Sequence, residues 1–191
     1  MKKKARKSRT KAGKIKRHHG IKKNIYLWTG NGWGKSTSAF GAALRSLGHG
    51  YKVIIIQFMK GRKNRIGEYR IRKKLGKRFE IRQFGRPGFV NLRNPSVIDK
   101  RLAQQGFDYA KKAVRRKPFL LVLDEVNVAV RIGLLKENEV IRFVKSLPKS
   151  VNVYLTGRYA TKGMIRAADY VNKVEMFKGS KKLIGEKGID Y

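Results

Sequence analysis

The sequence contains no cysteine, and its histidines and acidic residues are few. The absence of cysteine excludes disulfide scaffolds, thiol nucleophiles, iron–sulfur clusters and Cys-ligated zinc. The three histidines, His18, His19 and His49, do not have the spacing of a metal site. Against 48 Lys and Arg there are only 12 Asp and Glu, so the net charge is +36. A chain this basic is expected to bind anionic ligands, and nucleic acid non-specifically at low salt.

Long apolar runs are also missing from the chain. The longest, residues 53–56 and 119–123, are far shorter than the roughly 20 residues that cross a bilayer. The basic N-terminus lacks the apolar segment of a secretory signal peptide, so a cytoplasmic protein without a membrane partner is predicted. A length of 191 residues, with 41% apolar and 10% aromatic side chains, predicts one globular domain with a full core.

The positive charge is unevenly distributed. Residues 1–23 hold twelve Lys and Arg and no acid, and the first acidic residue of the chain is Glu68. Because this segment has too little apolar surface to offset the entropy of ordering, we interpret it as a flexible basic arm before a domain at residues 24–191. Two interpretations of the arm stay open: a solvated tail, and a segment that binds RNA, DNA or another polyanion.

From residue 24 onward, apolar segments rich in β-branched residues alternate with segments of helical period. This alternation predicts an α/β domain with a mainly parallel sheet. The predicted strands are residues 24–29, 51–58, 78–84, 118–124, 151–156 and 170–177. Helices are predicted at 35–47, 95–116 and 137–147, and the stripe of the second that should face the sheet is Ile98, Leu102, Gly106, Tyr109 and Ala113. Residues 59–67 and 85–94 are predicted loops beside strand ends, where open α/β sheets bind ligands.

A glycine-rich turn joins the first predicted strand to the first predicted helix in NIYLWTGNGWGKS (24–36). The turn contains three glycines, Gly30, Gly32 and Gly34. Glycine allows positive φ angles and lets backbone N–H groups come close to phosphate oxygens. Lys35 supplies charge for the outer phosphates, and the Ser36 hydroxyl can ligate Mg²⁺. The pattern G-x-x-x-x-G-K-[ST] has glycine where this chain has threonine, at position 29. The segment is therefore a variant phosphate-binding loop (P-loop), and a fortuitous match is the alternative if the motif stands alone.

A second motif, FLLVLDE (119–125), is an apolar strand that ends in two carboxylates. At the end of a buried strand, Asp124 can hold Mg²⁺ or a water bound to it, and Glu125 can ligate the metal or polarise a water. The alternative is a strand whose exposed end happens to be acidic. In a chain with so few acids, two adjacent ones behind a P-loop favour a Mg-nucleotide site.

In combination, these residues resemble the ATP:corrinoid adenosyltransferase family, whose members act on cob(I)alamin or cob(I)yrinic acid a,c-diamide. The family's loop TGNGKGKT and helix AFG-ALR-LGHG correspond to TGNGWGKS (29–36) and AFGAALRSLGHG (39–50). Further matches in the same order are QFMKG (57–61), Gly88 with Phe89, LDEVN (123–127), GLL (133–135), TGR (156–158) and KGIDY (187–191). The resemblance covers roughly residues 24–191 and is far more specific than a P-loop alone.

The resemblance implies a RecA-like P-loop NTPase fold of three layers, with Mg²⁺ as cofactor. It implies transfer of the 5′-deoxyadenosyl group of ATP to the Co(I) of a corrinoid, with release of triphosphate, in adenosylcobalamin biosynthesis or salvage. Co(I) is itself a strong nucleophile, so the protein would position the substrates and neutralise charge. A reductase or reductant that supplies Co(I), and a homodimer, are implied as partners.

The resemblance also assigns roles residue by residue. Catalytic roles fall to Lys35, Phe89 and Glu125, and the implied metal ligands are Ser36, Asp124 and Glu125. Phe89 matches an aromatic residue that lies against the corrin and helps to displace its lower ligand, which makes Co(II) easier to reduce. The implied nucleotide contacts are Thr29, Gly30, Asn31, Gly32, Trp33, Gly34, Lys35, Ser36, Arg45 and Arg158.

Three positions depart from the family pattern. Trp33 replaces a second lysine of the loop, so one charge is lost and an aromatic side chain is gained. This side chain could stack on adenine or on a corrin edge, or it could have a packing role. Asn91 stands where the family has a second aromatic residue, and KGSKK (178–182) replaces a KHPF stretch.

Two other functions are weighed against adenosyl transfer. The +36 charge and the basic arm favour a nucleic-acid-associated P-loop ATPase. The loss of the second loop lysine favours a nucleotide-binding module without chemistry. The three hypotheses differ in their products, because only adenosyl transfer releases inorganic triphosphate instead of ADP and phosphate.

Overall fold

The computed structural model describes residues 23–61, 66–88, 90–179 and 186–189. Within these ranges the elements are, in chain order, β1 (Ile25–Thr29), α1 (Lys35–Gly48), β2 (Val53–Phe58), α2 (Gly67–Ile71), β3 (Phe79–Phe84), α3 (Val97–Val114), β4 (Leu120–Asp124), α4 (Val126–Arg131), α5 (Glu137–Ser146), β5 (Asn152–Thr156), α6 (Lys162–Ala167) and β6 (Tyr170–Lys173). Strands alternate with helices along the chain, as the sequence predicts.

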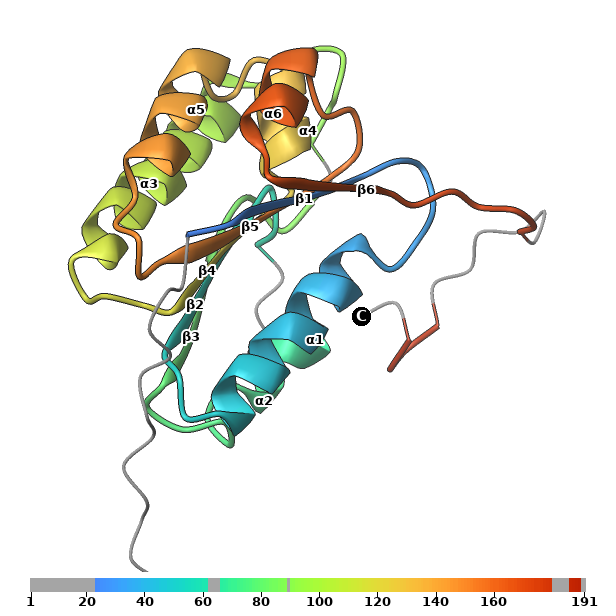
Figure 1. The fold of residues 1–191 in the computed structure, drawn as a ribbon. Helices are drawn as coiled ribbons and strands as arrows, with labels where there is room; N and C mark the ends of the chain where they lie inside the picture. Colours follow the sequence, from blue (N-terminus) through green and yellow to red (C-terminus); the bar gives the residue numbers. More distant parts are fainter. Residues whose placement is uncertain (1–22, 62–65, 89, 180–185, 190–191) are drawn as a thin grey trace, which may run out of the picture.

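The six strands form one sheet in the order β3-β2-β4-β5-β1-β6, and every neighbouring pair is parallel (Figure 1). The predicted α/β class is therefore confirmed, with a sheet that is parallel throughout the described chain. The register aligns the carboxyl ends of the strands, because Gln57 of β2 pairs with Asp124 of β4 on one side and Gln83 of β3 on the other. Between β4 and the P-loop strand β1 lies β5.

Helices cover both faces of the sheet, which gives the predicted three layers. In Figure 1, α1 and α2 lie on one face and α3, α4, α5 and α6 on the other. Each face has its own apolar cluster, one built around Ala39 and Ala43 of α1 and the other around Phe107 of α3 and Val140 of α5. All residues of β2 and β4 are buried, whereas the four residues of the edge strand β6 are exposed. The central strands thus read as continuous apolar runs because both of their faces are covered.

The three predicted long helices are present, and the predicted stripe of α3 is right at Gly106 and Ala113 but wrong at its start. Ile98 is 47% exposed, and the residues that are buried are Asp99, Ala103, Gly106, Phe107, Ala110 and Ala113. Ser96 and Asp99 form a reciprocal capping box, and the Asp99 carboxylate also receives two hydrogen bonds from Arg86 (2.8 and 3.0 Å). These contacts turn Asp99 inward, so the first buried positions are 99 and 103 instead of 98 and 102.

Three short helices, α2, α4 and α6, were not predicted. None is longer than 6 residues, and such lengths give too little periodicity to recognise. The predicted last strand is too long, since β6 ends at Lys173 and the chain then runs toward the P-loop.

At the start of the described chain, Lys23 contacts the domain. Its ammonium group donates to the carbonyl oxygens of Val144, Lys145 and Leu147, at 3.2, 2.5 and 3.1 Å, and so caps the C-terminal end of α5. The domain therefore includes this residue, which the sequence places in the arm, and the rest of the arm lies outside the described residues. No helix of the described ranges is long and apolar enough to span a membrane.

Candidate active site

The P-loop leaves the carboxyl end of β1 and runs into the first turn of α1. Gly30 and Gly34 have φ angles of +99° and +93°, and Gly34 is the N-cap of the helix. The chain after β6 lies against this loop, because the amide of Gly32 donates to the carbonyl oxygen of Val174 (2.8 Å). A side chain at Gly30 or Gly32 would overlap the backbone of Val174 or Glu175. These two glycines therefore permit a close approach of two chain segments as well as the loop's own conformation.

Lys35 lies in the first turn of α1 and folds back over the loop. Its side chain is buried, and the ammonium group donates to the carbonyl oxygen of Gly32. Burial lowers the pKa of Lys35, with Glu125 opposing that shift and Arg158 adding to it. The charge of Lys35 is thus held inside the loop, where the outer phosphates of a nucleotide would lie.

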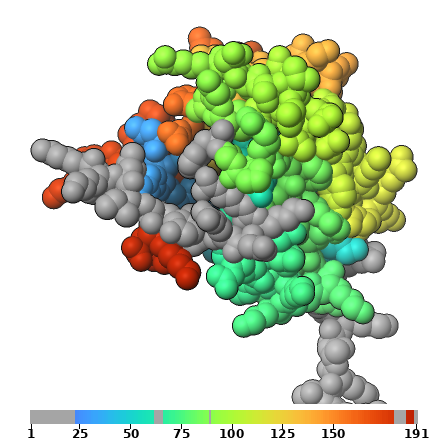
Figure 2. Space-filling model, turned by 180° about the vertical axis from the view of Figure 1, so that it is seen from behind, coloured from blue at the N-terminus to red at the C-terminus, as the bar shows by residue number. Residues whose placement is uncertain are grey.

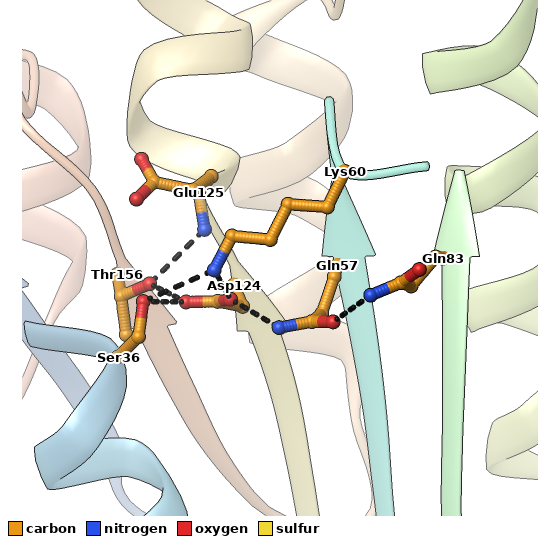
Figure 3. Close-up of polar contacts among 7 residues, drawn as sticks. All are labelled: Ser36, Gln57, Lys60, Gln83, Asp124, Glu125 and Thr156. Carbon is orange, nitrogen blue, oxygen red and sulfur yellow. Dashed lines mark hydrogen bonds and ion pairs between the residues drawn. The ribbon is translucent and has the colours of Figure 1, made fainter. Parts of the chain in front are cut away.

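Polar side chains from the ends of α1, β2, β4 and β5 meet around Asp124 (Figure 3). We call this group the Asp124 cluster and define it as Ser36, Gln57, Lys60, Asp124 and Thr156. The hydroxyl groups of Ser36 and Thr156 donate to Asp124 Oδ1 at 2.7 and 2.6 Å. Gln57 Nε2 and Lys60 Nζ donate to Asp124 Oδ2 at 2.9 and 2.7 Å. A second-row contact extends the cluster to β3, because Gln83 Nε2 donates to Gln57 Oε1 (2.8 Å). Both carboxylate oxygens of Asp124 are therefore fully engaged.

The Lys60 ammonium favours the ionised form of Asp124. Complete burial by itself raises the pKa of Asp124, but the Lys60 ammonium and the hydrogen bonds outweigh burial, so this pKa lies below its ordinary value. For Lys60, burial lowers the pKa and the charge of Asp124 raises it by more. The two groups therefore form an ion pair at the strand ends.

Glu125 follows Asp124 directly but is placed quite differently. Its backbone is left-handed, with a φ angle of +64°, and its amide donates to Thr156 Oγ1 (3.0 Å). In Figure 3 its carboxylate points away from Ser36 and Asp124. Burial raises the pKa of Glu125, and the charge of Asp124 adds to this, against the effects of Lys60, Lys35 and Arg158. A strained backbone therefore aims the second carboxylate at a different part of the site.

Asn127, in the first turn of α4, ties the two neighbouring strand ends together. Its amide nitrogen donates to the carbonyl oxygens of Trp28 (3.0 Å) and Gly157 (2.9 Å). A second link joins the same strand ends, since the Ala160 amide donates to Thr29 Oγ1 (3.2 Å). Figure 2 shows the P-loop region in blue beside the orange segment that follows β5. The P-loop is thus held in a fixed position relative to β5.

The remaining predicted contacts lie in three places. Asn31 and Trp33 are exposed on the loop, with Trp33 exposed by 55%, and Arg158 is exposed just after β5. Arg45 lies near the far end of α1, ten residues and about 15 Å from Lys35, so the structure does not bring it to the loop. Phe89 lies outside the described residues.

Sequence reasoning assigned no role to Gln57, Lys60 or Thr156. Each lies at or just after the carboxyl end of a strand adjacent to β4, where a parallel sheet collects its ligand-binding side chains. A polar residue at or just after the carboxyl end of a mainly apolar strand was the available signal. It requires the strand order, which the sequence does not give.

The side-chain atoms available to ligate a metal ion at this site suit a hard cation such as Mg²⁺. Ser36 and Asp124 offer oxygen atoms, a lysine ammonium already lies between them, and no nitrogen or sulfur ligand takes part. Among the residues that the structure describes, no group of three or more His, Cys, Asp or Glu side chains is placed to hold a metal ion. Mg²⁺ needs no such group, because it is usually held by one or two carboxylates together with substrate phosphates and water.

The sheet is parallel, a P-loop joins β1 to α1, and two acids lie at the end of β4. These features define a P-loop nucleotide-binding protein of the RecA-like type. Within that class, the profile of the family "ATP:corrinoid adenosyltransferase BtuR/CobO/CobP" matches residues 22–191, and the chain belongs to this family.

Three curated relatives illustrate the similarity. The corrinoid adenosyltransferase of Pseudomonas aeruginosa is 33% identical over 170 residues, which cover 87% of this chain and 83% of the relative. That of Sinorhizobium sp. is 33% identical over 156 residues, covering 81% and 72%. The Escherichia coli K12 enzyme is 31% identical over 173 residues, covering 87% and 85%. The similarity therefore extends over most of the length of each protein.

Proposed function

We propose that this chain transfers the 5′-deoxyadenosyl group of ATP to the Co(I) atom of a corrinoid and releases inorganic triphosphate. The observation that carries the proposal is the pairing of Ser36, next to the P-loop lysine, with the strand-end carboxylate of Asp124 at 2.7 Å, in a chain of this family. In the reaction, cobalt donates an electron pair to C5′ of ATP. The bond from C5′ to oxygen breaks, and the pair of electrons leaves with the triphosphate.

The residues of the P-loop would bind and stabilise the leaving group. Lys35 is buried beside the loop carbonyl of Gly32, and it can exchange that contact for oxygens of the triphosphate. The loop amides and the N-terminus of α1 face the same ligand. Since negative charge builds up on the triphosphate in the transition state, these groups are expected to act on kcat as well as on ATP binding.

We propose that Mg²⁺ binds with the nucleotide at Ser36 and Asp124, with Glu125 as a further ligand. Bound there, the metal would neutralise charge on the departing triphosphate. Asp124 supplies a carboxylate kept ionised by its surroundings, and Ser36 supplies a hydroxyl oxygen that Asp124 orients. Glu125 would have to turn toward them. No general base is needed, because Co(I) carries no proton to remove.

Positioning is the other contribution expected of the protein. Holding C5′ in line with cobalt removes much of the entropy barrier of a bimolecular reaction. Trp33, exposed on the P-loop, and Phe89, outside the described residues, are proposed to contact the substrates. For Phe89 the proposal predicts that Phe89→Ala slows the reaction from Co(II) more than the reaction from pre-reduced Co(I). Equal losses would assign this residue to packing instead.

The test of the proposed function is formation of an adenosylated corrinoid. Wild-type protein, ATP, Mg²⁺ and chemically reduced cobalamin or cobyrinic acid a,c-diamide are incubated in the dark, and the cobalt–carbon product is followed by its light-sensitive absorption spectrum. Lys35→Ala should lose most of the activity, at least a hundredfold or about 3 kcal/mol of transition-state stabilisation. The matched control is Lys136→Ala, which removes an exposed lysine just before α5 and should leave the activity normal. Normal turnover by Lys35→Ala would refute the assignment of the loop.

Partners beyond the substrates are also proposals. A homodimer is tested by light scattering, and the source of Co(I) by assay with candidate reductases. A cytoplasmic location can be checked by cell fractionation.

The basic arm is tested by deletion of residues 2–22, which spares Lys23 and its contacts with α5. The deletion should leave turnover intact and should lower retention of the protein on nucleic acid at low salt.

A further inference from the structure

Lys60 occupies the position between the two groups proposed to bind Mg²⁺. Its ammonium nitrogen lies 2.7 Å from Asp124 Oδ2 and 3.4 Å from Ser36 Oγ, and Figure 3 shows it directed at both. A lysine ammonium and a metal ion cannot share these oxygens, because two like charges at contact distance repel strongly. Binding of the metal at Ser36 and Asp124 therefore requires Lys60 to move.

We infer that Lys60 is an exchangeable cation of the nucleotide site. It holds the place of Mg²⁺ in the free protein and transfers to the triphosphate when Mg²⁺ and ATP bind. The inference rests on the proposed function, and it adds a residue to which no role has been assigned.

The free protein needs a positive charge beside Asp124. The Asp124 side chain is 0% exposed and accepts from two hydroxyls and one amide besides Lys60. These neutral donors do not balance a full negative charge, and a buried carboxylate without a cation is strongly destabilising. Lys60 supplies that cation, and Mg²⁺ would supply it in the loaded site.

The side chain of Lys60 is free to move, whereas its backbone is held in place. Its backbone follows β2, where the Met59 amide donates to the carbonyl oxygen of Phe84 (2.9 Å). The chains at Gly61 and Gly85 approach so closely that a Cβ on either would overlap the other segment's backbone. The lysine side chain itself remains 25% exposed. Rotation of its flexible stem can therefore move the ammonium group without moving the loop.

The displaced ammonium group of Lys60 has a new partner close by, in the phosphates of the bound nucleotide. The side chain already reaches within 3.4 Å of Ser36, the residue after the P-loop lysine, so a small rotation brings Nζ to phosphates held by that loop. The loop carries one lysine, and Trp33 stands beside it. A second cation from the end of β2 would thus add to the charge that Lys35 supplies to a triphosphate.

Removal of the Lys60 charge should change the affinities for a metal ion and for triphosphate in opposite directions. In Lys60→Met, the cation that competes for Asp124 is lost, so Mn²⁺ alone, measured by electron paramagnetic resonance, should bind about tenfold more tightly than to wild type. Inorganic triphosphate with saturating Mg²⁺, measured by calorimetry, should bind about tenfold more weakly, because the transferred ammonium is missing. The melting temperature of Lys60→Met should be lowered in EDTA and should rise with Mn²⁺ by more than that of wild type.

Two variants keep this test interpretable. Lys60→Gln retains an amide donor for Asp124 without the charge, and it replaces Lys60→Met if the latter does not fold. Lys136→Met removes an exposed lysine and should change neither affinity. Unchanged or weaker Mn²⁺ binding in the Lys60 variants would overturn the placeholder role. Tighter Mn²⁺ binding with unchanged triphosphate affinity would overturn the transfer to phosphate.

Failure of the inference can be told apart from failure of the proposed function. If wild type forms adenosylcorrinoid while the Lys60 variants show no opposed change, the inference is wrong and the function stands. If the wild-type protein does not bind triphosphate in the presence of Mg²⁺ and does not form adenosylcorrinoid, the proposed function itself fails.

Discussion

Asp124 and Glu125 are neighbours in the chain and differ in almost every physical respect. Asp124 is completely buried, has four donors on its carboxylate and a pKa below the ordinary value. The Glu125 carboxylate has no hydrogen-bond partner among the described residues, and burial raises its pKa. The difference teaches that two adjacent acids need not share a role. In the free protein the Asp124 carboxylate links the strand ends, whereas the Glu125 carboxylate takes no part in that network.

The largest effect is expected from removing the charge of Asp124. Asp124→Asn leaves the Lys60 ammonium without its partner, and the free energy of unfolding in urea should fall by about 3 kcal/mol. This is the low end for a broken buried pair, because Lys60 can turn toward solvent. Asp108→Asn, which removes a half-buried acid paired with Lys111, is the control and should change stability by less than about 0.5 kcal/mol. Equal effects of the two substitutions would remove the distinction drawn for Asp124.

Glu125→Gln should act on metal use and not on folding. Its carboxylate accepts no hydrogen bond from a described residue, so the free energy of unfolding near the ordinary pKa of glutamate should change by less than about 1 kcal/mol. The Mg²⁺ concentration that half-saturates turnover should rise several-fold. An unchanged Mg²⁺ titration would assign the metal to Asp124 and Ser36 without Glu125.

The pH dependence of stability provides a finer test of Glu125. A carboxyl group whose pKa is higher in the folded protein than in the unfolded chain binds its proton more tightly when folded. Wild type should therefore lose stability relative to Glu125→Gln as pH rises above the ordinary glutamate value, until the pH passes the folded-state pKa. Urea unfolding in EDTA across this pH range measures the difference. A difference that does not vary with pH would show that the pKa is not raised.

The smallest effect on folding is expected at Trp33. Its side chain is 55% exposed, so Trp33→Ala should change the free energy of unfolding by no more than about 0.5 kcal/mol. If the ring stacks on adenine or on the corrin, the KM for that substrate should rise about fivefold. A lower melting temperature with unchanged KM values would instead indicate a packing role.

Much of the fold and of the P-loop could be predicted because the signals are local. The apolar strands, the glycine turn and the acids at positions 124 and 125 lie within short windows of sequence. The first buried position of α3 could not be predicted, because it depends on the contact of Asp99 with Arg86, thirteen residues away. Lys60 and Thr156 were missed for the same reason, since only the strand order brings them to Asp124. The second function of Gly30 and Gly32 depends on a segment more than 140 residues later.

The most direct test of adenosyl transfer is the phosphorus balance of the reaction. Wild-type protein, ATP, Mg²⁺ and a pre-reduced corrinoid are followed together by phosphorus NMR and by absorption of the cobalt–carbon product. We predict one inorganic triphosphate for each adenosylated corrinoid, and no triphosphate when the corrinoid is omitted. Formation of ADP and phosphate, independent of the corrinoid and without a cobalt–carbon bond, would contradict the account and indicate an ATPase.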